Sequence, residues 1–218
     1  MNTDYTHITV LLDRTGSMQS IRDDTIGGFN AFLNQQKAEP GMATLTLVQF
    51  DSQDPYEVVH NFRALPSVPE LTRATFVPRA STPLLDAMGR CINDLEKNLL
   101  DMQESDRPAR VVVVVITDGQ ENASREFRAE QVRSMIKEKQ EQADWQFVFL
   151  SADLAAINDA LASGVRAGAA MAFDKNAKGT AAVWQSASAR IADYRASRKP
   201  NVAFTDEDRA NQENEKNR

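Results

Sequence analysis

The sequence predicts an α/β fold: a Rossmann-like, doubly wound and mostly parallel sheet with helices on both faces. Two observations lead to this prediction. Short β-rich runs alternate with segments of helical apolar spacing along most of the chain. In addition, residues 111–116 form a continuous β-branched run, which is typical of a central strand buried on both faces. Such a sheet binds ligands beyond the carboxyl ends of its strands.

The first third of the chain predicts a strand, a helix and a hairpin. Residues 7–12 form an apolar run that stops at Asp13, and apolar residues at steps of three to five predict a helix over 18–33. Residues 43–51 and 56–62 are β-rich and are joined by a turn sequence, which indicates a hairpin. We therefore expect one strand of the sheet to be antiparallel, at the edge.

A long loop and a series of helices and strands are expected next. Residues 63–81 contain three prolines and no clean period, which is typical of a loop. Thr82 then suits a helix N-cap and Pro83 the first helical position. The remaining expected elements are helices over 84–102 and 124–141, a strand over 111–116, a strand over 145–150, a helix from 154, a strand over 169–173 and a last helix over 179–195.

Composition indicates a water-soluble, cytoplasmic protein. Of the 218 residues 42% are hydrophobic and 26% are charged, with a formal net charge of −6. We expect no general attraction to nucleic acid or anionic membranes, and the longest apolar run is too short to span a bilayer. A single cysteine, Cys91, leaves no internal disulfide and favours a reducing compartment. We expect one domain over 1–199 and a charged, disordered tail over 200–218.

Small oxygen-bearing side chains gather at the expected strand ends. Asp13 and Asp118 each follow a strand, and Thr15 and Ser17 alternate with Asp13 in the turn. Oxygen donors without His or Cys select Mg²⁺, with Mn²⁺ or Ca²⁺ as alternatives, over zinc or copper. Each residue alone could be a helix cap or a strand end, but together they favour a metal site. The predicted metal ligands are Asp13, Thr15, Ser17, Thr82 and Asp118.

Three stretches resemble the metal-ion-dependent adhesion site of von Willebrand factor type A (VWA) domains. Residues 13–18 resemble its first loop, 81–87 its second and 116–119 its third. The combination of residues 68–71 with residues 81–83 looks especially like bacterial and phage cytoplasmic members. The resemblance implies coordination through the hydroxyls, with the two carboxylates acting directly or through water. Thr15 stands where the family more often has Ser.

The resemblance also implies a function without catalysis. A protein partner would supply an Asp or Glu side chain to the bound metal, and related bacterial domains often work beside ATPases. On this basis we expect a binding module and not an enzyme, with no catalytic residues.

Two other interpretations stay open. The turn at Asp13 also resembles the aspartyl-phosphate turn of haloacid-dehalogenase phosphatases, in which Asp13 would be the nucleophile. That chemistry needs a lysine between Thr82 and Asp118, where only Lys97 is found, on the outer face of a helix. A metal-independent scaffold with a vestigial site is the other alternative.

Four further residues have expected local roles. The Gly27-Gly28 pair is expected to allow close packing of a helix against a neighbour. Arg14 is expected to be solvated at the rim of the sheet. Asn122 is expected either to lie beside the site or to begin a helix.

Overall fold

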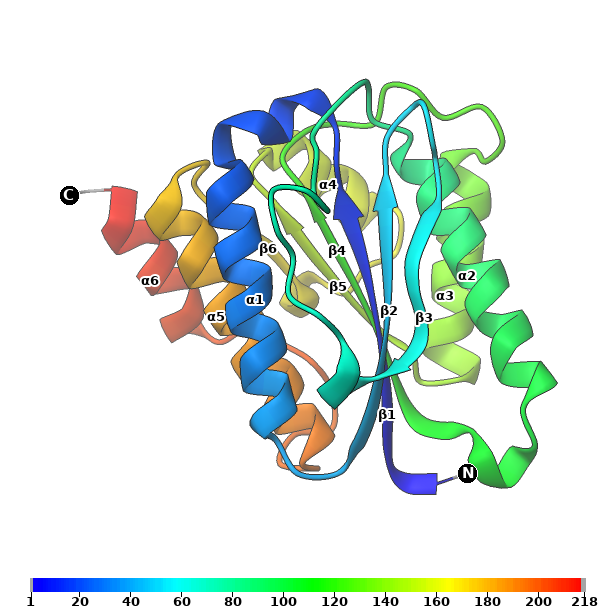
Figure 1. Ribbon diagram of the computed structural model, residues 1–218. Helices are drawn as coiled ribbons and strands as arrows, with labels where there is room; N and C mark the ends of the chain where they lie inside the picture. The colour runs from blue at the N-terminus through cyan, green and yellow to red at the C-terminus, as the bar shows by residue number, and fades with distance from the viewer. Residues whose placement is uncertain (1, 217–218) are drawn as a thin grey trace.

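One sheet organises the computed structural model, which describes residues 2–216. Within these residues six strands pair in the order β3-β2-β1-β4-β5-β6 (Figure 1). All neighbours are parallel except β2 and β3, which are antiparallel at the edge. The predicted sheet and its antiparallel edge strand are therefore confirmed. The strands are β1 (Asn2–Asp13), β2 (Met42–Phe50), β3 (Glu57–Ala64), β4 (Pro108–Thr117), β5 (Gln146–Ser151) and β6 (Ala170–Ala172).

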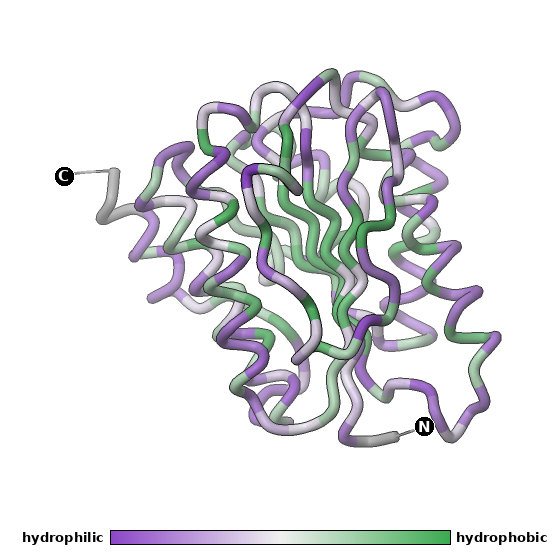
Figure 2. Tube along the Cα trace, viewed as in Figure 1, coloured by the Kyte–Doolittle hydropathy of each residue, from purple (hydrophilic) through white to green (hydrophobic). Residues whose placement is uncertain are grey.

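Helices cover both faces of the sheet, as predicted. α1 (Arg22–Ala38) and α5 (Ala177–Arg195) lie on one face, and α2 (Leu84–Asp101), α3 (Ala129–Gln142) and α4 (Leu154–Ala162) lie on the other (Figure 1). Figure 2 shows apolar residues concentrated in the strands and hydrophilic residues on the outer sides of the helices. Among the described residues, no helix combines the length and apolar character needed to cross a membrane.

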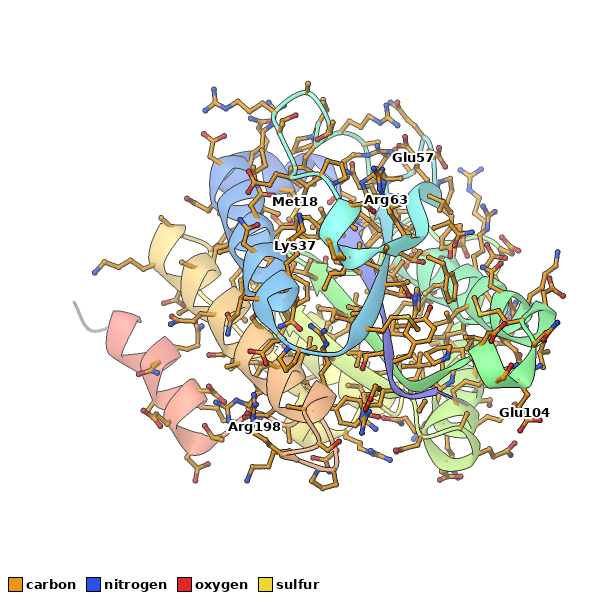
Figure 3. The ribbon with its side chains drawn as sticks, turned by 60° about the horizontal axis from the view of Figure 1, so that its bottom comes forward. Met18, Lys37, Glu57, Arg63, Glu104 and Arg198 are labelled. Atoms are coloured by element: carbon orange, nitrogen blue, oxygen red, sulfur yellow. The ribbon has the colours of Figure 1, made fainter. Side chains whose placement is uncertain are left out.

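The loop that follows β3 packs on the same face of the sheet as α1. After a 3-10 turn, η2 (Leu65–Ser67), it buries Leu71 and Phe76 in the same apolar layer as α1. The Lys37 ammonium of α1, labelled in Figure 3, donates to the carbonyl oxygen of Val68 at 2.7 Å. The predicted long loop is therefore part of the core.

Two helices begin later than the sequence predicts. The expected helix over 18–33 is preceded by a 3-10 turn, η1 (Gly16–Ile21), and α1 starts at Arg22. The expected helix over 124–141 starts only at Ala129. Residues 125–127 instead form part of a loop whose backbone N–H groups donate to the carboxylate of Asp86 in α2.

The prediction of a disordered tail over 200–218 is wrong for the described residues. Helix α6 (Asp206–Lys216) packs outside α5 (Figure 1). Val202 and Phe204 are buried, and the Phe204 N–H donates to the carbonyl oxygen of Gly168 at 2.7 Å. Two apolar residues thus anchor a segment whose charge alone favoured disorder. Residues 217 and 218 lie outside the described part of the chain.

Gly28 allows α1 and α5 to pack closely, as predicted. A Cβ added at Gly28 would lie 2.1 Å from Cδ1 of Trp184, which is buried in α5. At Gly27, one position earlier, an added Cβ would meet nothing within 4 Å. The two positions therefore allow a direct comparison, because a side chain would clash with Trp184 at Gly28 and meet nothing at Gly27.

Gly28→Ala should lower the free energy of unfolding by about 1–3 kcal/mol, because the new methyl group forces the indole of Trp184 out of its packed position. Gly27→Ala should leave it unchanged or raise it by about 0.5–1 kcal/mol, since alanine is the better helix former. Urea denaturation of both variants measures the difference. Equal effects at the two positions would contradict this packing.

His7 is a buried, neutral histidine within the sheet. Its ring stacks on Phe62 with the ring centroids 3.7 Å apart. Nδ1 lies 2.8 Å from Oγ1 of Thr44, and Nε2 lies 3.1 Å from Oγ1 of Thr9. Burial lowers the pKa of His7 from 6.5 to about 3. The unfolded chain therefore binds a proton between these pH values that the folded protein does not bind.

The stability that neutral His7 contributes is present above pH 6.5 and is lost as the pH falls toward 3. We expect the free energy of unfolding to fall in this range by up to about 1.4 kcal/mol per pH unit more in the wild type than in His7→Gln. Urea denaturation of both proteins at several pH values between 7.5 and 4.5 measures this slope. Parallel profiles would show that His7 titrates alike in both states.

Candidate metal centre

The strand register brings two carboxylates to the same end of the sheet. β1 and β4 are parallel neighbours, with Leu12 opposite Ile116. Asp13 directly follows Leu12, and Asp118 lies two residues beyond Ile116. Because carboxyl ends of parallel strands share one edge, both acids lie on the edge where the sequence predicts the site.

Asp13 is completely buried at this edge. Its Oδ1 accepts the backbone N–H of Thr15 at 2.7 Å, and its Oδ2 accepts the hydroxyl of Thr117 at 2.5 Å. Burial raises the pKa of Asp13 to about 7, against the hydrogen bonds that lower it, and the charge of Asp118 raises it further. A negative charge here therefore needs compensation from a proton or a cation.

The other carboxylate has one oxygen without a hydrogen bond. Ser17 donates its hydroxyl to Asp118 Oδ1 at 2.5 Å, and Oγ1 of Thr15 lies 3.2 Å from Oγ of Ser17. Asp118 Oδ2 is buried and receives no hydrogen bond from the described residues; it forms an ion pair with the ammonium of Lys175. Thr15 is buried and Ser17 is exposed, so the cluster reaches the surface.

Thr82 is not a helix N-cap, contrary to the prediction. Helix α2 begins at Leu84 with Pro83 in the cap position, and no side chain caps it. The backbone of Thr82 instead joins the loop that follows Asp118: its N–H donates to Oδ1 of Asn122 at 2.8 Å, and its carbonyl accepts the N–H groups of Asn122 and Ala123. Thr82 is a buried residue, and its side chain offers one hydroxyl oxygen for a ligand at this edge.

Two acidic side chains fix these loops. Oε1 of Glu121 accepts the N–H groups of Ala123 and Ser124, and Oε2 accepts the N–H of Leu85 at 2.9 Å. Asp86 accepts three backbone N–H groups of the same loop at 2.8–2.9 Å. The loop after β4 is thereby tied to the start of α2, which positions Thr82 relative to Asp118. The sequence predicted no role for either acid.

Arg14 is buried and ion-paired, so the expectation of a solvated side chain is wrong. Its guanidinium lies 2.7 Å from Asp51 Oδ2 and also pairs with Glu57, which Figure 3 labels. Arg79 donates to the same oxygen of Asp51 at 2.9 Å. Burial raises the pKa of Asp51, but the hydrogen bonds from Arg79, two backbone amides and Arg14 hold it below its usual value. Arg14 therefore fixes the first loop and is not free for a partner.

Three residues complete the local picture. Asn122 bonds to Thr82 and does not begin a helix, since α3 starts at Ala129. Thr117 and Lys175 contact the two carboxylates, and the sequence analysis assigned no role to either. The position of Lys175 just after the short strand predicted over 169–173 was the signal that could have revealed it, since that strand ends on the same edge.

The donor set depends on hydroxyls. Among the described residues no group of three or more His, Cys, Asp or Glu side chains is placed to hold a metal ion. A cation at this edge would therefore use the two carboxylates together with neutral hydroxyl oxygens, the set that suits Mg²⁺ or Mn²⁺.

Asp86→Asn should loosen the loop that positions Thr82, because one amide oxygen cannot accept all three N–H groups and the new NH₂ group faces a donor. We expect a loss of about 1–3 kcal/mol in the free energy of unfolding and faster amide hydrogen exchange in residues 122–127. Asp101→Asn, at an exposed carboxylate at the end of the same helix, is the control and should change neither. Unchanged exchange in Asp86→Asn would contradict this role.

Comparison with known proteins supports the fold. No family model and no curated protein matches the sequence. Among solved structures, the manganese-loaded TRAP protein of Plasmodium vivax has 15% identity and a TM-score of 0.58, and the match covers 94% of this chain and 76% of that chain. A von Willebrand factor type A protein from Catenulispora acidiphila has 10% identity and a TM-score of 0.56, over 86% of this chain and 42% of the other.

A third structure, proximal thread matrix protein 1 from the mussel byssus, matches at 12% identity over 69% of this chain and 38% of its own, with a TM-score of 0.47. The chain thus spans less than half the length of the Catenulispora and mussel chains. Identities this low support the fold and nothing finer. From the sheet order, the helices on both faces and these structures, the chain has the α/β fold of a VWA domain.

Proposed function

We propose that the chain is a metal-dependent protein-binding module. A divalent cation, with Mg²⁺ as the preferred candidate, would be held by the side chains of Asp13, Thr15, Ser17, Thr82 and Asp118. This cation would accept the carboxylate of an Asp or Glu from a partner protein. The observation that carries the proposal is the gathering of the Thr15 and Ser17 hydroxyls beside the buried carboxylate of Asp118, whose Oδ2 is paired with the partly exposed ammonium of Lys175.

The spacing of the hydroxyls supports this assignment. Two oxygens bound at right angles to Mg²⁺, each at about 2.1 Å, are about 3 Å apart. Oγ1 of Thr15 and Oγ of Ser17 are 3.2 Å apart before any adjustment.

The charge balance supports a partner carboxylate. The hydroxyl ligands are neutral, and Asp13 already uses both of its oxygens in hydrogen bonds. The cation would therefore keep much of its positive character and attract an additional oxygen anion. Ser17 is exposed, which gives such a side chain access. The manganese-loaded TRAP protein shows that a protein similar in fold can carry a divalent ion.

We also propose that the chain does not transfer phosphoryl groups. A nucleophilic aspartate must present an oxygen to its substrate. Asp13 is fully buried with both oxygens hydrogen-bonded, and Lys97 lies exposed on α2. An aryl phosphate assay with Mg²⁺ should find no hydrolysis above that of Asp13→Asn.

Calorimetric titration of Mg²⁺ and Mn²⁺ tests the metal site. Binding should be weakened at least about tenfold in Thr82→Ala and lost in Asp118→Ala, whereas Thr82→Ser, which keeps the hydroxyl, should bind. Ser20→Ala is the matched control, since Ser20 lies on the same 3-10 turn as Ser17 and its exposed hydroxyl donates to the carbonyl oxygen of Ser17. Absence of binding to the wild type, or equal binding to every variant, would contradict the site.

Affinity capture tests the partner. Proteins retained by the wild type in Mg²⁺ should be released by a chelator and should not be retained by Thr82→Ala. A partner that stays bound in chelator would favour the metal-independent scaffold. A synthetic peptide of the captured partner with its acidic residue changed to the amide should lose binding, because the amide carries no charge for the cation.

A further inference from the structure

The positive charge of a lysine lies beside Asp118, one of the proposed metal ligands. The ammonium of Lys175 forms an ion pair with Oδ2 of Asp118, the oxygen that receives no hydrogen bond. The side chain of Asp118 is 0% exposed and that of Lys175 is 37% exposed. The pair therefore joins a buried anion to a cation that still has access to solvent.

The backbone holds Lys175 at this edge from both sides. On the strand side, the Phe173 N–H donates to the carbonyl oxygen of Ser151 at 3.0 Å, which extends the pairing of β6 with β5. On the helix side, Oδ1 of Asn176 accepts the Gly179 N–H at 2.9 Å and caps α5. Only two residues separate Phe173 from Asn176, so the backbone keeps Lys175 beside Asp118.

The Lys175–Asp118 ion pair compensates buried negative charge when no metal ion is bound. Asp13 and Asp118 are both buried, and they lie at the carboxyl ends of neighbouring parallel strands. A positive charge beside Asp118 lowers the repulsion between the two acids. A divalent cation would do the same, but it could not share the oxygen with an ammonium group, because like charges at such short distance repel.

We propose that Lys175 sets the metal affinity of this site by competing with the divalent cation for Asp118. The inference rests on the proposed function, since it concerns the same site. Metal binding breaks the Lys175–Asp118 pair and moves the ammonium toward solvent, to which the side chain is already partly open. The free energy needed to break the pair lowers the affinity of the site for the ion.

Calorimetric titration of Mg²⁺ into Lys175→Gln, Lys175→Arg and the wild type tests the competition. Lys175→Gln should bind Mg²⁺ about 3–10-fold more tightly, the range expected when a partly buried ion pair no longer has to be broken. Lys175→Arg keeps the charge and should bind close to the wild type. Lys199→Gln removes the same charge from an exposed lysine beyond the far end of α5 and controls for net charge.

Thermal unfolding gives a second readout that does not depend on the absolute affinity. In chelator, Lys175→Gln should melt about 2–4 °C below the wild type, because the buried carboxylates lose their counter-charge. Saturating Mg²⁺ should remove this difference. Lys199→Gln should follow the wild type in both conditions.

The outcomes separate this inference from the proposed function. Metal binding with equal affinity in wild type and Lys175→Gln, or weaker binding in Lys175→Gln, would overturn the competition and leave the metal site intact. No metal binding in any variant would overturn the proposed function itself. Tighter binding in Lys175→Gln together with the chelator-dependent loss of stability would establish Lys175 as the competing cation.

Discussion

Two buried carboxylates at neighbouring strand ends are the constraint on which the rest of the site depends. Parallel pairing of β1 with β4 puts Asp13 and Asp118 on one edge, where burial and mutual repulsion make two negative charges unfavourable. Hydrogen bonds from Thr15, Thr117 and Ser17 offset part of this cost. A proton or a cation offsets the rest. Lys175 supplies a positive charge beside Asp118, and a divalent cation would compete with it for that carboxylate.

The loops around these acids are fixed by hydrogen bonds that backbone N–H groups donate to acidic side chains, and not by helix caps. Asp86 and Glu121 hold the loop after β4, and Asn122 ties that loop to the backbone of Thr82. On the other side, Arg14 and its buried partner Asp51 hold the first loop. Donors fixed before a ligand arrives lose little conformational freedom on binding, which favours affinity.

Local pattern was sufficient for the sheet and insufficient for the loops. The β-branched run in β4 and the two segments of the hairpin predicted the parallel sheet and its antiparallel edge because apolar periodicity reports burial directly. The start of α3 and the role of Thr82 depend on acceptors distant in sequence, Asp86 and Asn122, which no local pattern contains. The tail was mispredicted because its charge obscured the anchoring residues Val202 and Phe204. The role of Lys175 was not predicted for the same reason as that of Asp86: its partner, Asp118, is distant in sequence and is brought close by the order of the strands.

Paramagnetic broadening of backbone amide signals by Mn²⁺ tests the central claim most directly, because it locates the ion without relying on a substitution. At substoichiometric Mn²⁺ the amides of residues 14–18, 81–83 and 117–120 should broaden first, and excess Mg²⁺ should restore them. Broadening that starts in the acidic first turn of α6, Asp206–Asp208, or that is spread evenly over the surface would show that the ion does not bind between Asp13 and Asp118.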